Sequence, residues 1–68
     1  MESLGNRLKN RRKELGMTQG QLAEKLNIHQ VTYQGYEKNK HKPDIDMLSM
    51  LADKLKISAD YLLGRYKE

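Results

Sequence analysis

The feature that most constrains the fold is a connection of only two or three residues between two short helices. Thr18 and Gln21 mark the start of the first helix, because their T-x-x-Q spacing lets each side chain bond the other residue's free backbone N–H group. The second helix is expected at residues 29–38. Between them stand Asn27, which is suited to the left-handed residue after a last helical turn, and Ile28. So short a connection forces the two helices to cross at a steep angle.

The apolar residues of this pair predict how the two helices pack. Ala23 is expected where they come closest, since a larger side chain there would push them apart. Met17 and Leu22 have the spacing of a hydrophobic staple around the helix start. The other inner contacts are expected from Leu26, Ile28, Tyr33 and Tyr36. An ordinary helical hairpin in a small bundle is the alternative interpretation.

Helical periodicity predicts three further helices. The first ends at Gly16, the fourth begins after the proline loop with Asp44 as its N-cap, and a short fifth runs from Ser58 to Gly64. Their apolar repeats are Leu4, Leu8 and Leu15 in the first, Leu48, Leu51, Ala52 and Leu55 in the fourth, and Tyr61, Leu62 and Leu63 in the fifth. Because no stretch alternates with period two, the expected fold class is all-α with five helices.

The length and charge of the chain narrow its function. Its 68 residues are expected to form one domain, too small for a nucleotide-binding α/β fold. The formal net charge is +4, and the excess is uneven: residues 1–42 hold nine Lys and Arg but four Asp and Glu. A basic surface of this kind favours a polyanionic partner.

Several classes of protein are disfavoured. The chain has no cysteine, so neither a disulfide nor a thiolate zinc site is expected. His29 and His41 lack the spacing of metal ligands or of a catalytic triad, so we expect no metal, no cofactor and no enzyme activity. No apolar run approaches the roughly 18 residues of a membrane span. A cytoplasmic protein with no membrane contact is expected.

Residues 4–63 resemble the Cro/C1-type (XRE-like) helix-turn-helix domain of phage repressors and related bacterial regulators. The resemblance rests on Leu4-x-x-x-Leu8, Arg12-x-x-Leu15-Gly16-Met17-Thr18-Gln19-x-x-Leu22-Ala23, Ile28-x-x-x-Thr32, Tyr36-Glu37-x-Asn39-Lys40-x-x-Pro43 and Ile57-Ser58-x-x-Tyr61-Leu62-Leu63-Gly64. It implies a lambda-repressor-like bundle whose helix-turn-helix spans residues 18–38. It further implies a regulator, with repression as the expected activity, that binds double-stranded DNA through its third helix.

The candidates for base contacts lie on that helix. Gln30 is the first, because a glutamine amide can pair with adenine N6 and N7 in the major groove. Val31 is expected to face outward, where its methyl groups would pack on a thymine methyl, unless it is simply an exposed apolar residue. Gln34 reads either a base or a phosphate. Gly35 is also expected to point outward, so either the backbone approaches DNA closely there or the position reads nothing.

Phosphate contacts are expected on both sides of the groove, from side chains that position the protein without reading sequence. The candidates are Thr18, Gln19, His29, Thr32, Lys38, Lys40 and Lys42, although any single lysine can instead be an ordinary solvated side chain. The resemblance adds that Gln19 bonds both a phosphate and Gln30. It also pairs Arg12 with Glu37, two charges that lie near apolar stripes and would be costly if unpaired.

The last third of the chain is slightly acidic and rich in apolar residues, which suits a protein contact better than DNA. The resemblance implies that helices 4 and 5, at residues 44–63, pack on the bundle and form a homodimer that binds a near-palindromic operator. The apolar surplus is Ile45, Met47, Met50, Ile57, Tyr61 and Leu62, of which Ile57 and Leu62 are expected to complete the core. The alternative function is a protein-interaction module, such as an antitoxin or a component controlled by an anti-repressor.

Overall fold

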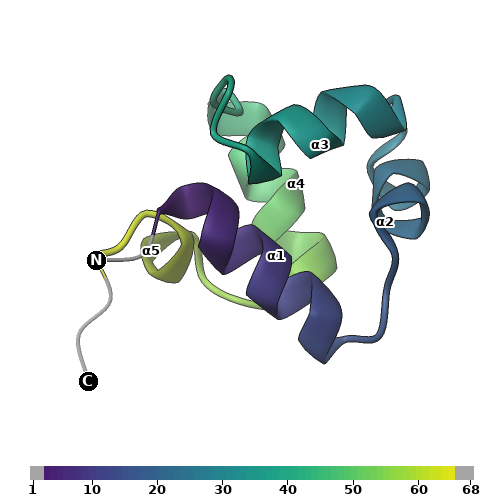
Figure 1. Ribbon diagram of the computed structural model, residues 1–68. Helices are drawn as coiled ribbons and strands as arrows, with labels where there is room; N and C mark the ends of the chain where they lie inside the picture. The colour runs from purple at the N-terminus through teal and green to yellow at the C-terminus, as the bar shows by residue number, and fades with distance from the viewer. Residues whose placement is uncertain (1–2, 66–68) are drawn as a thin grey trace.

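The computed structural model describes residues 3–65, which contain five helices and no strand (Figure 1). The helices are α1 (Leu4–Glu14), α2 (Gln19–Leu26), α3 (Gln30–Glu37), α4 (Ile45–Leu55) and α5 (Ala59–Leu62). In Figure 1, α3 lies across one end of the bundle, with α2 beside its start and α1 and α4 beneath it. The expected all-α class with five helices is confirmed.

Side-chain caps define most of the helix ends. The side chains of Ser3, Thr18, Asp44 and Ser58 each accept a hydrogen bond from a backbone N–H in the first turn of their helix. Both bonds of the predicted capping box are present, from Gln21 N–H to Thr18 Oγ1 at 3.0 Å and from Thr18 N–H to Gln21 Oε1 at 2.9 Å. Since caps of this kind fix where a helix starts, the element boundaries follow from the sequence.

Left-handed residues end the helices. Asn27, with φ of 59°, ends α2 as expected, and Ile28 N–H then bonds Ala23 O at 3.0 Å. Asn39 and Gly16 also have positive φ, at 59° and 72°. These conformations close the short connections with their backbone groups paired, which is how two helices meet across so few residues.

One core joins all five helices. Its buried members are Leu8, Leu22, Ala23, Leu26, Tyr33, Tyr36, Leu51, Leu55 and Leu62. Leu62 is fully buried and Ile57 packs against this cluster, as expected. Leu15 does not continue the apolar stripe of α1, and that expectation was wrong: the residue follows the last helical residue, where the backbone turns, and is 37% exposed.

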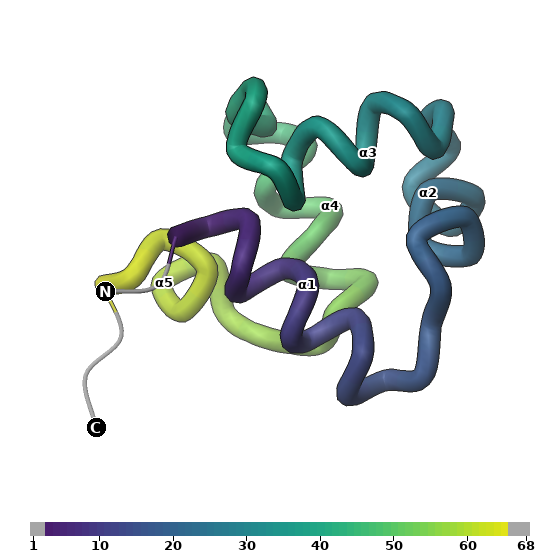
Figure 2. The backbone as a smooth tube through the Cα atoms, viewed as in Figure 1, coloured from purple at the N-terminus to yellow at the C-terminus, as the bar shows by residue number. Residues whose placement is uncertain are grey.

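Two polar contacts fix α1 to segments that are distant in the sequence, whose backbone path can be followed in Figure 2. Arg11 donates from Nε to the Leu55 carbonyl oxygen at 2.8 Å, which satisfies a free acceptor at the end of α4. At the other end, Gly5 N–H bonds Asn39 Oδ1 at 3.1 Å, just after α3. A Cβ on Gly5 would lie 2.7 Å from the Glu37 carbonyl carbon, so only glycine allows this approach. Among the described residues, no helix is long and apolar enough to cross a membrane.

Candidate nucleic-acid interface

The two sides of α3 differ sharply in exposure. Tyr33, Tyr36 and Glu37 are buried against the bundle, whereas Val31 is 76% exposed. This is the orientation expected from helical periodicity, and it places the outer side of α3 on the surface of the molecule (Figure 1). The expected span of residues 29–38 is shortened by one residue at each end, because His29 and Lys38 are the capping residues.

Glu37 holds the inner side of α3 in place. Arg12 Nε lies 2.7 Å from Glu37 Oε2, so the expected pair of charges is present, and both residues are more than nine-tenths buried. Tyr33 donates its hydroxyl to the same oxygen at 2.5 Å. Gln19 Nε2 and Arg12 Nη2 donate to Oε1 at 2.9 and 3.3 Å. Each carboxylate oxygen therefore accepts two hydrogen bonds, which compensates the loss of water around a buried charge.

The electrostatics of this cluster favour the charged forms. Burial alone would raise the pKa of Glu37, but hydrogen bonds from Arg12, Tyr33 and Gln19 outweigh it and hold that pKa below its usual value. The bond to Glu37 raises the pKa of Arg12. Burial, and then the neighbouring carboxylate, raise the pKa of Tyr33, so the phenol stays protonated and keeps donating.

Gln19 has a different partner from the one that the resemblance implied. Its amide donates to Glu37, and no bond joins it to Gln30 within the described residues. The reason is geometric: Glu37 Oε1 lies within reach of the first turn of α2, and a charged acceptor binds an amide more strongly than a neutral one. Gln19 therefore links the start of α2 to the charge pair beneath α3.

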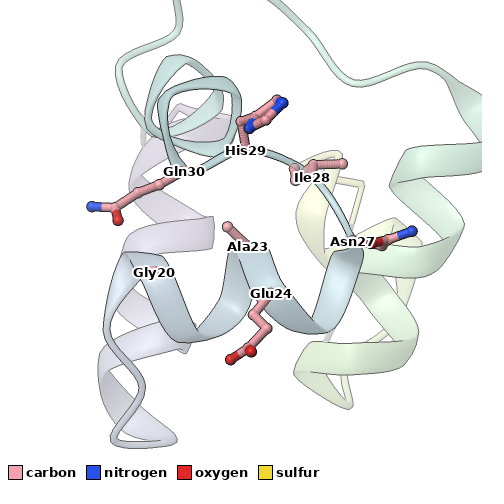
Figure 3. A pocket seen from close by; sticks show the side chains of 7 residues that line it. All are labelled: Gly20, Ala23, Glu24, Asn27, Ile28, His29 and Gln30. Atoms are coloured by element: carbon pink, nitrogen blue, oxygen red, sulfur yellow. The ribbon is translucent and has the colours of Figure 1, made fainter.

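Gln30 extends from the start of α3 over the first turn of α2 (Figure 3). A Cβ on Gly20 would lie 3.0 Å from Gln30 Oε1, so the glycine leaves room for this amide. Both belong to a shallow hollow on the outer side of the two helices, lined by Gly20, Ala23, Glu24, Asn27, Ile28, His29 and Gln30. Ala23 points from α2 toward the start of α3 and is 2% exposed, as its predicted place at the crossing requires.

Gly35 lies one helical turn from Val31 but is not exposed, so the expectation of an open surface at this position was wrong. The residue is buried because the imidazole of His41 covers it from the loop after α3. His41 Nε2 lies 3.1 Å from the Thr32 carbonyl oxygen, and its ring meets Tyr36 edge-on with 5.0 Å between centroids. Periodicity within α3 gives no sign of this contact, because the covering group comes from outside the helix.

The remaining candidates surround the outer side of α3. Thr32 and Gln34 are half-buried on its shoulders, and Thr18 is exposed at the start of α2. His29 is exposed and makes no side-chain cap. Three exposed lysines, Lys38, Lys40 and Lys42, follow the last turn. Apart from Gly35, which His41 covers, the predicted contact residues are exposed or half-buried and belong to α2, α3, their capping residues and the loop after α3. Within residues 3–65 no group of three or more His, Cys, Asp or Glu side chains is placed to hold a metal ion.

Comparisons with known proteins also identify a helix-turn-helix. A family model described as helix-turn-helix matches residues 8–62. The HTH-type transcriptional regulator ImmR of Bacillus subtilis (strain 168) is 46% identical over 63 residues, which are 93% of this chain and 50% of that protein. The cryptic phage CTXphi transcriptional repressor RstR of Vibrio cholerae is 40% identical over 60 residues, 88% of this chain and 54% of the repressor. The chain therefore spans about half the length of the curated relatives it matches.

Among solved structures, the fold matches the P22 c2 repressor protein crystallised in complex with synthetic operator 9T. The TM-score is 0.91 and the sequence identity 29%, with 97% of this chain and all of that chain covered. The named proteins are transcriptional regulators and repressors rather than enzymes.

Proposed function

Since the chain belongs to the Cro/C1-type (XRE-like) helix-turn-helix family, we propose that it binds double-stranded DNA in a sequence-specific manner and represses transcription. The proposal places α3 in the major groove, with Gln30 and Val31 as the principal base contacts and Gln34 on the shoulder. A helix of eight residues is about 12 Å long, which fits a groove about 12 Å wide.

The observation that carries this proposal is the fixed orientation of α3. Its inner side is tied to the bundle through Glu37 and Tyr33, so the helix can enter a groove without losing a contact of the fold. Val31 on the other side is 76% exposed, in a position to pack on a thymine methyl. The P22 c2 repressor, of the same fold, was solved on operator DNA, which supports the same use of this surface.

Phosphate contacts would surround the helix on two sides. Thr18, Gln19 and the backbone amides at the start of α2 offer donors on one side, and Lys38, Lys40 and Lys42 offer positive charge on the other. Thr32 and His29 complete the candidate set. Neutralising several phosphates makes affinity fall steeply as salt rises.

We also propose that two copies assemble through α4 and α5 on a near-palindromic operator. Ile45 at the start of α4 is 82% exposed, and Met50 in α4 and Leu63 just after α5 also expose large apolar side chains. Apolar groups exposed beyond the needs of the core are typical of contact surfaces. A two-fold pair would set half-sites about 34 Å apart, one turn of the duplex.

Selection of bound sequences from a random duplex pool tests the proposal. We expect enrichment of one near-palindromic sequence, and a logarithm of affinity that falls linearly with the logarithm of salt concentration. Ile45→Asp, which places a charge on the exposed start of α4, should weaken binding to the palindrome more than binding to a single half-site.

Other outcomes contradict parts of the proposal. No enrichment above background, together with a stable complex with a protein partner, would favour the protein-interaction module. Enrichment of an unpaired half-site alone would argue against the dimer while leaving sequence-specific binding in place.

A further inference from the structure

Gly35 has an unusual position for a glycine. It lies inside α3, where glycine is less favourable than alanine. Its φ is not positive, so the backbone conformation does not require glycine. A Cβ at this residue would lie 2.7 Å from His41 Nε2 and 2.8 Å from Nδ1. The missing side chain therefore leaves the space that the imidazole of His41 fills.

His41 is held in that space by two contacts. Nε2 lies 3.1 Å from the Thr32 carbonyl oxygen, so Nε2 carries the proton and donates it. The ring also meets Tyr36 edge-on, at a centroid distance of 5.0 Å and an interplanar angle of 77°. The loop after α3 thus places its imidazole where a side chain of residue 35 would project. Residue 35 lies one helical turn from Val31, on the exposed side of α3.

We infer that His41 takes the place of residue 35 on the DNA-facing side of α3 and reads a base edge there. The inference rests on the proposed function. With Nε2–H engaged by Thr32, Nδ1 is the nitrogen left to accept a hydrogen bond. The matching donors in the major groove are the amino groups of cytosine N4 and adenine N6. Gly35 would then act through His41, as the residue that leaves space for the ring.

The packing half of this inference is tested without DNA, by thermal unfolding of Gly35→Ala in three backgrounds. With His41→Ala, the alanine should raise the melting temperature by about 4–8 °C, because the helix gains propensity without displacing a ring. In the parent chain the same change displaces the imidazole, so the gain should be smaller by several degrees or become a loss. His29→Ala, which removes the other histidine, should behave as the parent does. Equal shifts in all three backgrounds would overturn the inference.

The readout half is tested on the operator enriched from the random pool and on all its single base-pair variants. The parent should discriminate against substitutions at one A·T or C·G pair by about 5- to 150-fold. Both His41→Ala and Gly35→Ala should lose that preference while keeping the preferences at other pairs. Lys42→Ala, a neighbouring change, should weaken binding to all variants alike.

Two further results separate the inference from the proposed function. If His41→Ala keeps every base preference, or weakens all sequences alike, His41 reads no base and the inference fails while sequence-specific binding stands. If the parent itself enriches no sequence, the proposed function fails and base readout by His41 fails with it. The unfolding series still reports on the packing in that case.

Discussion

The inner and outer sides of α3, a helix of eight residues, differ in burial and in hydrogen bonding within the protein. On the inner side, Glu37 accepts four hydrogen bonds from three side chains, and Tyr33 is completely buried. On the outer side, Val31 is mostly exposed, and the exposed amide of Gln30 makes no hydrogen bond to another residue within residues 3–65. The polar groups on the inner side have their hydrogen-bond partners within the protein, whereas the groups on the outer side are available to an external partner.

This difference teaches that stability and recognition are separated across the width of one helix. A group that is buried and bonded costs free energy when it is removed, because its partners lose their compensation. Removal of an exposed side chain costs little free energy in the free protein. Its effect appears only when a partner binds to that surface. Substitutions on the inner side should therefore lower the stability of the free protein, and substitutions on the outer side should mainly change binding.

The largest expected effect is on the inner side. Glu37→Ala leaves the guanidinium of Arg12 buried without its partner and removes the acceptor for Tyr33 and Gln19. Removing one partner of a buried pair costs about 3–5 kcal/mol, which is a large share of the stability of so small a domain. Urea or thermal unfolding should show a much lower midpoint.

The matched control is the next residue along the chain. Lys38 is exposed, so Lys38→Ala should change the free energy of unfolding by less than about 0.5 kcal/mol. Comparable losses in the free energy of unfolding for Glu37→Ala and Lys38→Ala would mean that the hydrogen bonds to Glu37 contribute little. Such a result would contradict the division of α3 into a stabilising side and a binding side.

Acid should weaken the inner side selectively. The pKa of Glu37 is lower in the folded protein than in the unfolded chain, so its contribution is complete above the ordinary carboxyl pKa and is lost as the pH falls through the lower folded value. Melting temperatures measured from pH 7 down to about pH 2 should fall more steeply below about pH 4 in the parent than in Glu37→Gln, which has no proton to gain. Parallel curves for the two proteins would contradict the assignment.

Local rules predicted much of the fold. The capping box of Thr18 and Gln21, the left-handed Asn27 and the caps Asp44 and Ser58 all depend on neighbours within a few residues, so the sequence determines them directly. The inward set of α3 follows from the helical period, which is also a local property. These rules fixed the helix-turn-helix and the side of α3 that faces outward.

Contacts between distant segments were the ones that sequence reasoning missed. The cover that His41 places on Gly35 depends on the path of a loop, and the approach of Gly5 to Glu37 depends on how α1 crosses α3. Gln19 likewise bonds Glu37, 18 residues away, rather than the residue that the resemblance suggested. The only available signal was a pair of glycines inside helices, where glycine is unfavourable and so indicates close approach.

The smallest expected effect on the fold, and a specific effect on binding, belongs to Gln30 on the outer side. Its amide rests over Gly20 and is exposed, so Gln30→Ala should leave the free energy of unfolding within about 0.5 kcal/mol of the parent. If the amide of Gln30 pairs with adenine, the variant should lose about 1–3 kcal/mol of discrimination at one base pair.

Lys40→Ala, as the control, should weaken binding to matched and scrambled duplexes alike and lower the salt dependence, because a phosphate contact carries no sequence information. Binding isotherms on the two duplexes measure both effects. If Gln30→Ala and Lys40→Ala behave identically, the amide contributes position rather than readout, and recognition must then rest on Val31, Gln34 or the imidazole that covers Gly35.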